Sequence, residues 1–281
     1  MTEIIDSIDS IAERYDAVFC DVWGVVHNGR RIFPAAAAAL QRLRAAGKIV
    51  ILLTNVPKPR GPIPEQLDRL GFPRDAYNVI VTSGDAIRAE LAKRAPGPMY
   101  KIGPEGDRVL WEGLGLSQSP LEQAAFVAIS GPNDYRETPE DYADVLRQAK
   151  ARELKMLCAN PDIVVRVGEE LIWCAGAIAQ EYEKLGGRVV MAGKPHAPIY
   201  ELARRELRTL LDHEDPRILC IGDGVGTDVA GANAQGLDCL FVAAGIHGET
   251  LRSNGALDPE KVERALAEEN ATAAFAMAAL S

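Results

Sequence analysis

The fold is decided by the stretch Ala17-Val18-Phe19-Cys20-Asp21-Val22-Trp23-Gly24-Val25, in which a short apolar run ends in a carboxylate. A second apolar run, Ile218-Leu219-Cys220-Ile221, leads in the same way to Asp223. Runs of this kind are typical of strands buried on both faces of a parallel sheet. Side chains that follow such strands lie at the carboxyl edge of the sheet, where open α/β sheets bind their ligands. We therefore expect an α/β fold in which Asp21 and Asp223 could share one cation.

The composition is that of a folded protein with a full core. Hydrophobic residues make up 47% of the 281 positions and charged residues 25%, enough for one large or two moderate domains, and we favour two. The formal net charge is −9, and no cluster of Lys and Arg is visible. Because affinity for the phosphate backbone comes from clustered basic side chains, we expect a small-molecule partner and no nucleic acid.

The sequence carries no clear signal for membrane insertion, secretion or disulfide formation. No apolar stretch is long enough to cross a bilayer, and the amino terminus carries acids where a signal peptide would carry basic residues. We therefore expect a cytoplasmic protein that does not act at a membrane. The five cysteines lack Cys-x-x-Cys spacing, so neither a zinc site nor a disulfide framework is indicated. Cys20 and Cys220 fit the interior of strands as small core residues.

Strands and helices alternate along the first hundred residues. Apolar residues at helical spacing predict a helix over residues 4–15. Pro34 and Gly47 bracket an alanine-rich segment in the way that Pro and Gly bracket helices. Apolar runs at residues 48–53 and 79–82, with a helical pattern between them, complete βαβ units. We predict a doubly wound parallel sheet, and we expect the final alanine-rich stretch to be a further helix.

The middle of the chain alternates on its own and predicts a separate, inserted α/β domain over residues 98–187. The run Arg188-Val189-Val190-Met191 is then expected to return the chain to the first domain. The first domain is therefore predicted to be discontinuous, with residues 1–97 and 188–281 forming one core domain.

Polar residues at the expected strand ends form a pattern suited to phosphoryl transfer. The members are Asp21, Thr54, Lys194, Asp223 and Asp228. A carboxylate can attack phosphorus, a hydroxyl and an ammonium can hold phosphoryl oxygens, and carboxylates can hold magnesium, which prefers oxygen ligands.

With these residues the chain resembles the haloacid dehalogenase (HAD) superfamily of aspartate-nucleophile hydrolases, and within it the NagD-like class IIA branch. Four segments carry the resemblance, in this order: Asp21-Val22-Trp23-Gly24-Val25, Leu53-Thr54-Asn55, Gly193-Lys194-Pro195, and Gly222-Asp223-Gly224 with Thr227-Asp228. In the insertion, Ala159-Asn160-Pro161-Asp162 and Cys174-Ala175-Gly176-Ala177 resemble segments of that branch's cap.

The resemblance implies a magnesium-dependent phosphatase that forms an aspartyl phosphate. Asp21 would be the nucleophile, and Thr54 and Lys194 would bind phosphate. Mg²⁺ would be held by Asp21, the main-chain carbonyl of Trp23 and Asp223, with Asp228 supporting the metal shell. The expected substrate is a small phosphorylated metabolite such as a sugar phosphate, a nucleotide or pyridoxal phosphate. Cap surfaces in this branch could support a homodimer.

Three polar residues are candidates for substrate contacts: Asn55, Asn160 and Arg136. Asn55 belongs to the second motif, and the other two lie in the predicted cap. An arginine fork could hold a second anionic group of the substrate, although Arg136 could equally belong to a capping loop.

One position departs from the phosphatase pattern. Phosphatases of the family carry a second Asp two residues after the nucleophile, where this chain has Trp23. An indole cannot exchange a proton at neutral pH, so loss of this acid and base should lower turnover by roughly 10²–10⁴ unless another group substitutes. His27 is a candidate for the replacement, because an imidazole titrates near neutral pH. The alternative is that His27 is a loop histidine with no part in the reaction. Two other functions stay open: a phosphometabolite-binding protein with little or no catalysis, and a haloacid dehalogenase-type hydrolase.

Overall fold

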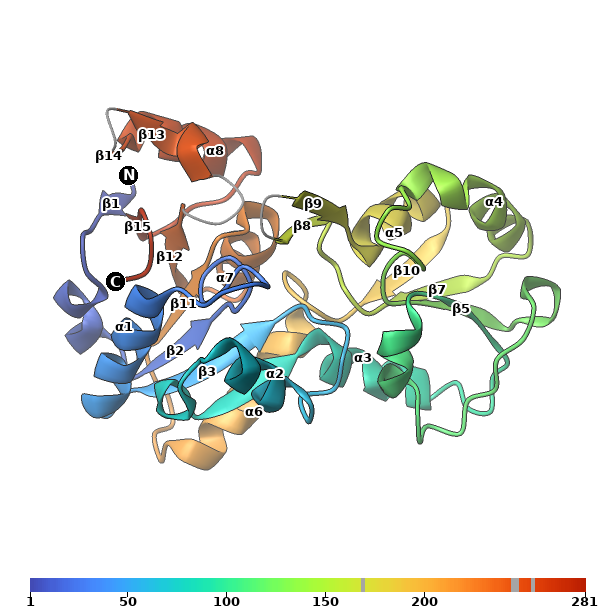
Figure 1. The fold of residues 1–281 in the computed structure, drawn as a ribbon, viewed down its shortest axis with the longest axis horizontal. Helices are drawn as coiled ribbons and strands as arrows, with labels where there is room; N and C mark the ends of the chain where they lie inside the picture. Colours follow the sequence, from blue (N-terminus) through green and yellow to red (C-terminus); the bar gives the residue numbers. More distant parts are fainter. Residues whose placement is uncertain (168–169, 244–247, 254–255) are drawn as a thin grey trace.

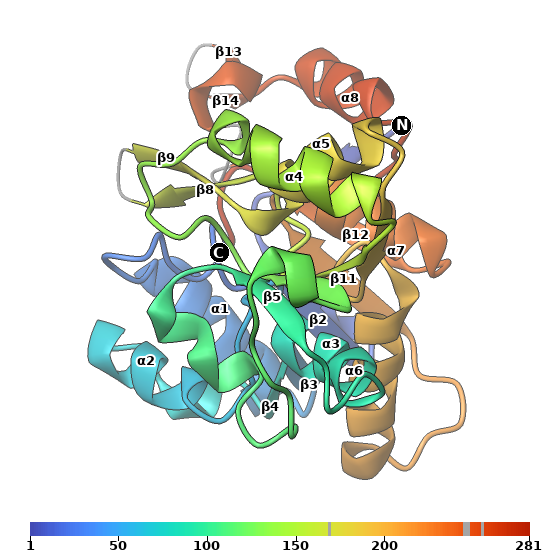
Figure 2. The same ribbon diagram turned by 90° about the vertical axis from the view of Figure 1, so that its right-hand side faces the viewer.

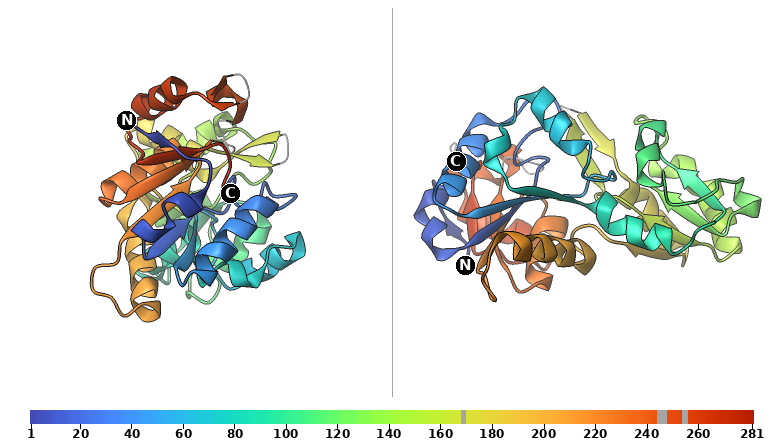
Figure 3. Two further views of the ribbon diagram at one scale, coloured as in Figure 1. Left: turned by 90° about the vertical axis from the view of Figure 1, so that its left-hand side faces the viewer. Right: turned by 90° about the horizontal axis from the view of Figure 1, so that it is seen from below.

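The protein, described here from a computed structural model, contains two α/β lobes (Figure 1). The structure describes residues 1–281 except 168–169, 244–247 and 254–255. One lobe is built on a seven-stranded sheet and the other on a four-stranded sheet. The second lobe extends beyond one end of the first, as the view from below shows (Figure 3). No helix of the described residues is long and apolar enough to span a membrane.

The core sheet is parallel throughout. Its strands, in spatial order, are β1 (Glu3–Ile4), β15 (Phe275–Met277), β12 (Asp238–Val242), β11 (Ile218–Gly222), β2 (Ala17–Cys20), β3 (Ile49–Thr54) and β4 (Val79–Thr82). Every residue of β2 and β11 is buried, which explains why these strands are continuous apolar runs. The two strands are neighbours, with Cys20 opposite Ile221, so the residues that follow them leave the sheet side by side.

Helices cover both faces of the core sheet. They are α1 (Pro34–Ala45), α2 (Ile63–Leu70), α3 (Ser83–Ala92), α6 (Ala197–Leu210), α7 (Ala230–Ala234) and α8 (Pro259–Glu268). Alternate strand residues enter two separate apolar clusters: Val18 and Cys20 pack with α1, while Ala17 and Phe19 pack with α6. The sheet is therefore doubly wound, as the sequence predicts, and Cys20 and Cys220 are core residues.

The inserted lobe, or cap, has its own parallel sheet and core (Figure 2). Its strands, in spatial order, are β10 (Arg188–Met191), β7 (Lys155–Cys158), β6 (Phe126–Ile129) and β5 (Met99–Ile102). One face packs on α4 (Ala143–Ala151) and α5 (Ala175–Lys184), and the other packs on α3 of the core. An antiparallel hairpin, β8 (Val164–Val167) and β9 (Glu170–Trp173), completes the cap.

Short segments complete the chain. They are the 3-10 turns η1 (Ile8–Ser10), η2 (Ala12–Arg14), η3 (Arg74–Ala76), η4 (Glu105–Leu110), η5 (Leu121–Gln123), η6 (Pro139–Tyr142) and η8 (Gly248–Leu251), the π-helical turn η7 (Val225–Val229), and a small ladder of β13 (Arg252–Ser253) with β14 (Ala256–Leu257).

Three predicted elements are wrong, each because long-range pairing overrides a local pattern. Residues 4–15 form β1 and two 3-10 turns, because Ile5 N–H bonds the Ala276 carbonyl and draws the chain into the sheet. The final alanine-rich stretch contains strand β15, which is paired on both sides. Residues 188–191 do not return to the core sheet but pair with β7 in the cap.

Candidate active site

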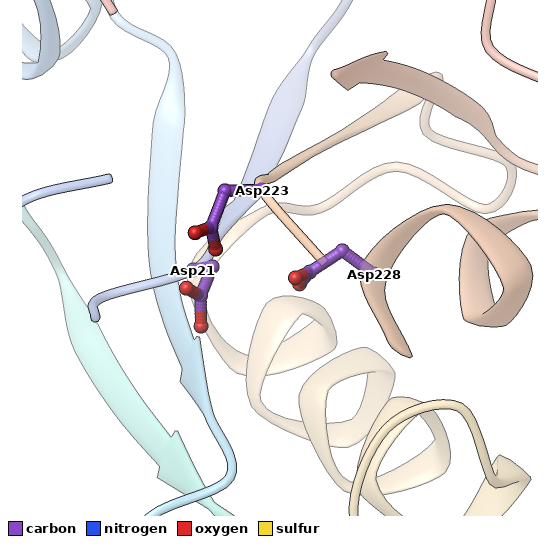
Figure 4. Close-up of side chains that lie close together, drawn as sticks. All are labelled: Asp21, Asp223 and Asp228. Atoms are coloured by element: carbon purple, nitrogen blue, oxygen red, sulfur yellow. The ribbon is translucent and has the colours of Figure 1, made fainter. Parts of the chain in front are cut away.

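Three aspartates converge at the carboxyl edge of the core sheet (Figure 4). Asp21 follows β2, and Asp223 follows the neighbouring strand β11. Asp228 is in η7, where the chain turns back and the Asp228 N–H bonds the Gly224 carbonyl at 2.8 Å. One carboxylate oxygen from each lies within 4.8 Å of the others, and all three side chains are buried.

Lys194 lies between two of these carboxylates. Its Nζ is 2.5 Å from Asp21 Oδ1 and 2.8 Å from Asp228 Oδ1, and the residue is only 3% exposed. Burial alone would lower the pKa of Lys194, but the charges of Asp21 and Asp228 outweigh it and raise the pKa above the usual value. Lys194 is therefore a fixed cation at neutral pH.

Burial raises the pKa of Asp21 even though Lys194 acts to lower it, and the charge of Asp228 adds to the rise. The cluster has three carboxyl groups and one ammonium, which bonds only Asp21 and Asp228. A second cation would relieve the repulsion between the carboxylates.

The donor set fits Mg²⁺, which takes hard oxygen ligands. The backbone at Trp23 and Gly24 passes close to the carboxylates, because a Cβ added at Gly24 would lie 2.2 Å from Asp223 Oδ2. Gly24 also has a φ of +88°, a conformation that residues with a side chain rarely adopt. Glycine is thus required at Gly24 for two reasons, and it allows the main chain to border the site.

Thr54 and Asn55, at the end of β3, border the same site. Both are buried, and Thr54 lines the cavity together with Asp21. Asn55 holds the main chain of Lys194 in both directions: its Oδ1 accepts from the Lys194 N–H at 2.8 Å, and its Nδ2 donates to the Lys194 carbonyl at 3.1 Å. The second and third sequence motifs are therefore joined by a pair of hydrogen bonds.

The cap closes the site. A cavity of about 220 Å³ lies over the aspartates and is bordered on the cap side by Asp162, Val164, Val165 and Arg166. Asp162 Oδ1 accepts a 2.7 Å hydrogen bond from Asn55 Nδ2. Trp23 donates its indole N–H to the Arg166 carbonyl in β8, also at 2.7 Å. The two domains therefore meet through two hydrogen bonds beside the cavity.

The predicted site residues divide into those that the structure brings together and those that it does not. Asp21, Trp23, Thr54, Asn55, Lys194, Asp223 and Asp228 all border the cavity. Asn160 is one step away, since its Oδ1 accepts from the Asp162 N–H at 3.0 Å and shapes the loop. Arg136 is not brought to the site: its side chain is 91% exposed and pairs with Asp134.

His27 lies in a neighbouring cavity that shares Trp23 and Thr54 with the first. Its Nδ1 accepts from the Gly29 N–H, and its ring meets the Trp23 indole edge to face, with the centroids 5.0 Å apart. Burial lowers the pKa of His27 to about 4, so the ring is neutral at neutral pH. Its position does not support the hypothesis that it carries a proton for the reaction.

Three ionisable cavity residues are not among those that the sequence predicts. Asp162 lies two positions after Asn160 in a segment that the family resemblance singles out, so a signal for it existed. Arg31 and Arg166 carry no motif, and only the folded structure brings them to the cavity.

Comparisons with known proteins agree with this architecture. Residues 18–117 match the family described as haloacid dehalogenase-like hydrolase, and residues 191–268 match HAD-hydrolase-like. A haloacid dehalogenase-like hydrolase from Brucella suis is 44% identical in sequence, with a TM-score of 0.88 over 99% of this chain and 100% of that one.

Two phosphatases are more distant relatives. Glycerol-3-phosphate phosphatase from Gallus gallus is 26% identical over 84% of this chain and 82% of its own. The glycerol phosphate phosphatase of Mycobacterium tuberculosis, solved in complex with magnesium, is 24% identical and shares the fold, with a TM-score of 0.64 over 91% of this chain and 76% of that one.

A doubly wound sheet with a lysine and carboxylates at its carboxyl edge, covered by an inserted α/β lobe, defines a class of capped hydrolases. The chain belongs to the haloacid dehalogenase-like hydrolase family, in its NagD-like class IIA branch.

Proposed function

We propose that the protein is a magnesium-dependent phosphatase that hydrolyses a small phosphorylated metabolite through an aspartyl phosphate on Asp21. The observation that carries the proposal is the convergence of Lys194 with Asp21, Asp223 and Asp228 under a cap. An ammonium suits phosphoryl oxygens, and grouped carboxylates suit a divalent cation. The glycerol phosphate phosphatases among the relatives support a phosphate ester as substrate.

Each residue has a distinct task in this proposal. Asp21 attacks phosphorus and then releases phosphate when water attacks the intermediate. Lys194 keeps Asp21 in place and attracts the phosphoryl group, while the Thr54 hydroxyl donates to a phosphoryl oxygen. Asp21, Asp223 and the Trp23 carbonyl would hold Mg²⁺, with Asp228 beside them. When bound, the ion would neutralise charge on the carboxylates and on the phosphoryl group.

The size of the cavity supports a small substrate. At about 220 Å³ it lies below the roughly 300–1,000 Å³ usual for drug-sized ligands. A larger cavity of about 730 Å³ adjoins it and shares Asp162, Val164, Gly224 and Thr227. A leaving group that exceeds the inner cavity could therefore extend into the outer one.

The test is phosphate release by purified protein with Mg²⁺ from a panel of glycerol phosphate, sugar phosphates, nucleotides, pyridoxal phosphate and 4-nitrophenyl phosphate. We expect release that chelation of Mg²⁺ stops and that Asp21→Asn abolishes. Asp144→Asn is the matched control, because Asp144 is an exposed cap aspartate paired with Arg147. Release that survives Asp21→Asn would reject the proposal.

Trp23 favours one competing function, a phosphometabolite-binding protein with little catalysis, because the residue replaces the usual acid and base. Calorimetric titration with the same panel separates the two. Magnesium-dependent binding of an ester without any phosphate release would favour the binding protein.

A further inference from the structure

Hydrolysis of an unactivated ester needs a proton for the leaving oxygen, and neither Trp23, at the usual position of the acid, nor the candidate His27 can supply it. Trp23 does not titrate at neutral pH. His27 is neutral and lies in the neighbouring cavity. Another side chain that borders the site would have to act if the protein itself supplies this proton.

The described lining of the inner cavity contains these ionisable side chains: Asp21, Arg31, Asp162, Arg166, Lys194, Asp223 and Asp228. Arginine stays protonated at all relevant pH values. Lys194 is held by two carboxylates, and the remaining aspartates form the proposed nucleophile and metal set. Asp162 is the one side chain of this lining that is left to exchange a proton.

The cap holds Asp162 in place. Its N–H bonds Asn160 Oδ1 at 3.0 Å, and its carbonyl accepts from the Gly176 N–H at 3.1 Å. A Cβ at Gly176 would lie 2.5 Å from that carbonyl, so the first turn of α5 presses directly on the loop. On the core side, Asn55 Nδ2 donates to Asp162 Oδ1 and also to the Lys194 carbonyl. Asp162 is thus fixed relative to the group that positions Asp21.

The Asn55 contact uses one carboxyl oxygen of Asp162. Among the hydrogen bonds between described residues, none reaches the other oxygen, Oδ2. A carboxyl group held at Oδ1 by a neutral amide can carry its proton on Oδ2.

Trp23 contributes to the same arrangement. Its indole N–H bonds the carbonyl of Arg166, four residues after Asp162 on the strand that continues the loop. The indole is itself confined, because a Cβ at Gly29 would lie 2.6 Å from its ring. Trp23, which stands where phosphatases of the family carry an acid, therefore anchors the cap segment that carries Asp162.

We infer that Asp162, reaching from the cap to the cavity over Asp21, is the general acid and base of the reaction in place of the family's second aspartate. The inference rests on the proposed phosphatase function. Trp23 is a positioning residue for it.

The steps balance. Asp21 Oδ forms a bond to phosphorus while the bond from phosphorus to the ester oxygen breaks, and that oxygen takes the proton of Asp162. The Asp162 carboxylate then takes a proton from water, whose oxygen attacks phosphorus as the bond to Asp21 breaks. Phosphate leaves, and Asp162 is protonated again.

The electrostatic surroundings of Asp162 favour its protonated form, which the first step uses. Enclosure between cap and core raises the pKa of Asp162, and the charge of Asp228 adds to the rise, whereas Lys194 and the Asn55 hydrogen bond act against it. An ionised Asp162 would in turn raise the pKa of Asp21. The nearby cap thiols of Cys158 and Cys174 add no charge to these surroundings, because burial raises their pKa and keeps them neutral at physiological pH.

The test compares two aryl esters of similar shape, phenyl phosphate and 4-nitrophenyl phosphate, in Asp162→Asn. Nitrophenolate leaves without protonation, whereas phenolate needs an acid. We expect kcat/KM for phenyl phosphate to fall by about 10²–10⁴ and that for 4-nitrophenyl phosphate by less than about tenfold. Phosphorylated Asp21 should accumulate with 4-nitrophenyl phosphate, seen as a burst and by mass spectrometry, because the water step loses its base.

Controls separate the possible failures. The amide oxygen introduced by Asp162→Asn can still accept from Asn55, so the fold contact is kept, and Asp144→Asn should match the wild type on both esters. Equal loss on the two esters, or no loss in an active protein, would overturn the role of Asp162 and leave the phosphatase proposal standing. A wild type that hydrolyses no ester of the panel would overturn the proposed function and this inference together.

Discussion

Replacement of Lys194 by methionine tests the electrostatics of the site in the metal-free protein. The substitution keeps most of the side-chain volume and removes the ammonium that bonds Asp21 Oδ1 and Asp228 Oδ1. All three side chains are at most 8% exposed. The two carboxylates then stay buried without their counter-charge.

The expected cost follows from that burial. Removing one partner of a buried ion pair typically destabilises a protein by about 3–5 kcal/mol, because the remaining charge is uncompensated. Burial already raises the pKa of Asp21, and loss of the ammonium would raise it further. The loss in free energy of unfolding is therefore complete above the raised pKa of Asp21 in the folded variant. It shrinks as pH falls toward about 4, where aspartates are protonated in the unfolded chain as well.

Urea unfolding with EDTA at pH 8 and pH 5 measures this cost. Lys194→Met should lose about 3–5 kcal/mol at pH 8 and clearly less at pH 5, and Mg²⁺ should restore part of the loss at pH 8. Lys184→Met is the control, since that exposed lysine pairs with Glu181 and should cost less than about 1 kcal/mol. A loss that is absent, or equal at the two pH values, would refute the reasoning.

Other substitutions test the metal set and the contact between domains. Gly24→Ala should weaken Mg²⁺ binding, measured by calorimetry, because the added Cβ would displace Asp223. Gly71 has a similar φ, and a Cβ added there would meet nothing within 4 Å. Gly71→Ala should therefore cost only about 1–2 kcal/mol of backbone strain and leave Mg²⁺ binding unchanged. Equal weakening of Mg²⁺ binding in both variants would count against the close contact between Gly24 and Asp223. Trp23→Phe should cost about 1–3 kcal/mol by leaving the Arg166 carbonyl unpaired, and should speed hydrogen exchange in β8, unlike Trp173→Phe in the exposed part of β9. Unchanged exchange in β8 would contradict the anchoring role of the indole.

The parts of the fold that could be predicted are those in which local pattern and tertiary structure agree. The runs of β2 and β11 are buried on both faces, so their composition reveals both the strand and the position of the carboxylate after it. The segment over residues 4–15 shows the limit. Ile8, Ile11 and Tyr15, three residues of the predicted helical face, are buried, but the pairing of β1 with β15 replaces helical hydrogen bonds.

The core half of the site could be predicted for the same reason, because adjacent parallel strands end at one edge. The cap half could not, since it depends on how two domains meet. The chemistry of Asn160 and Arg136 makes them candidates in the sequence, whereas Asp162 reaches the cavity because the loop after β7 turns it toward Asn55. Strand β10 illustrates the same limit, because its apolar run suits either sheet and only the pairing with β7 assigns it to the cap.

Acid quenching of the protein during turnover of 4-nitrophenyl phosphate with Mg²⁺, followed by peptide mass spectrometry, tests most directly whether Asp21 is the nucleophile. We expect a phosphoryl group on the peptide that contains Asp21, and none in Asp21→Asn. Hydrolysis that proceeds with the phosphoryl group on a different residue, or with no labelled peptide under any quench condition, would contradict the mechanism.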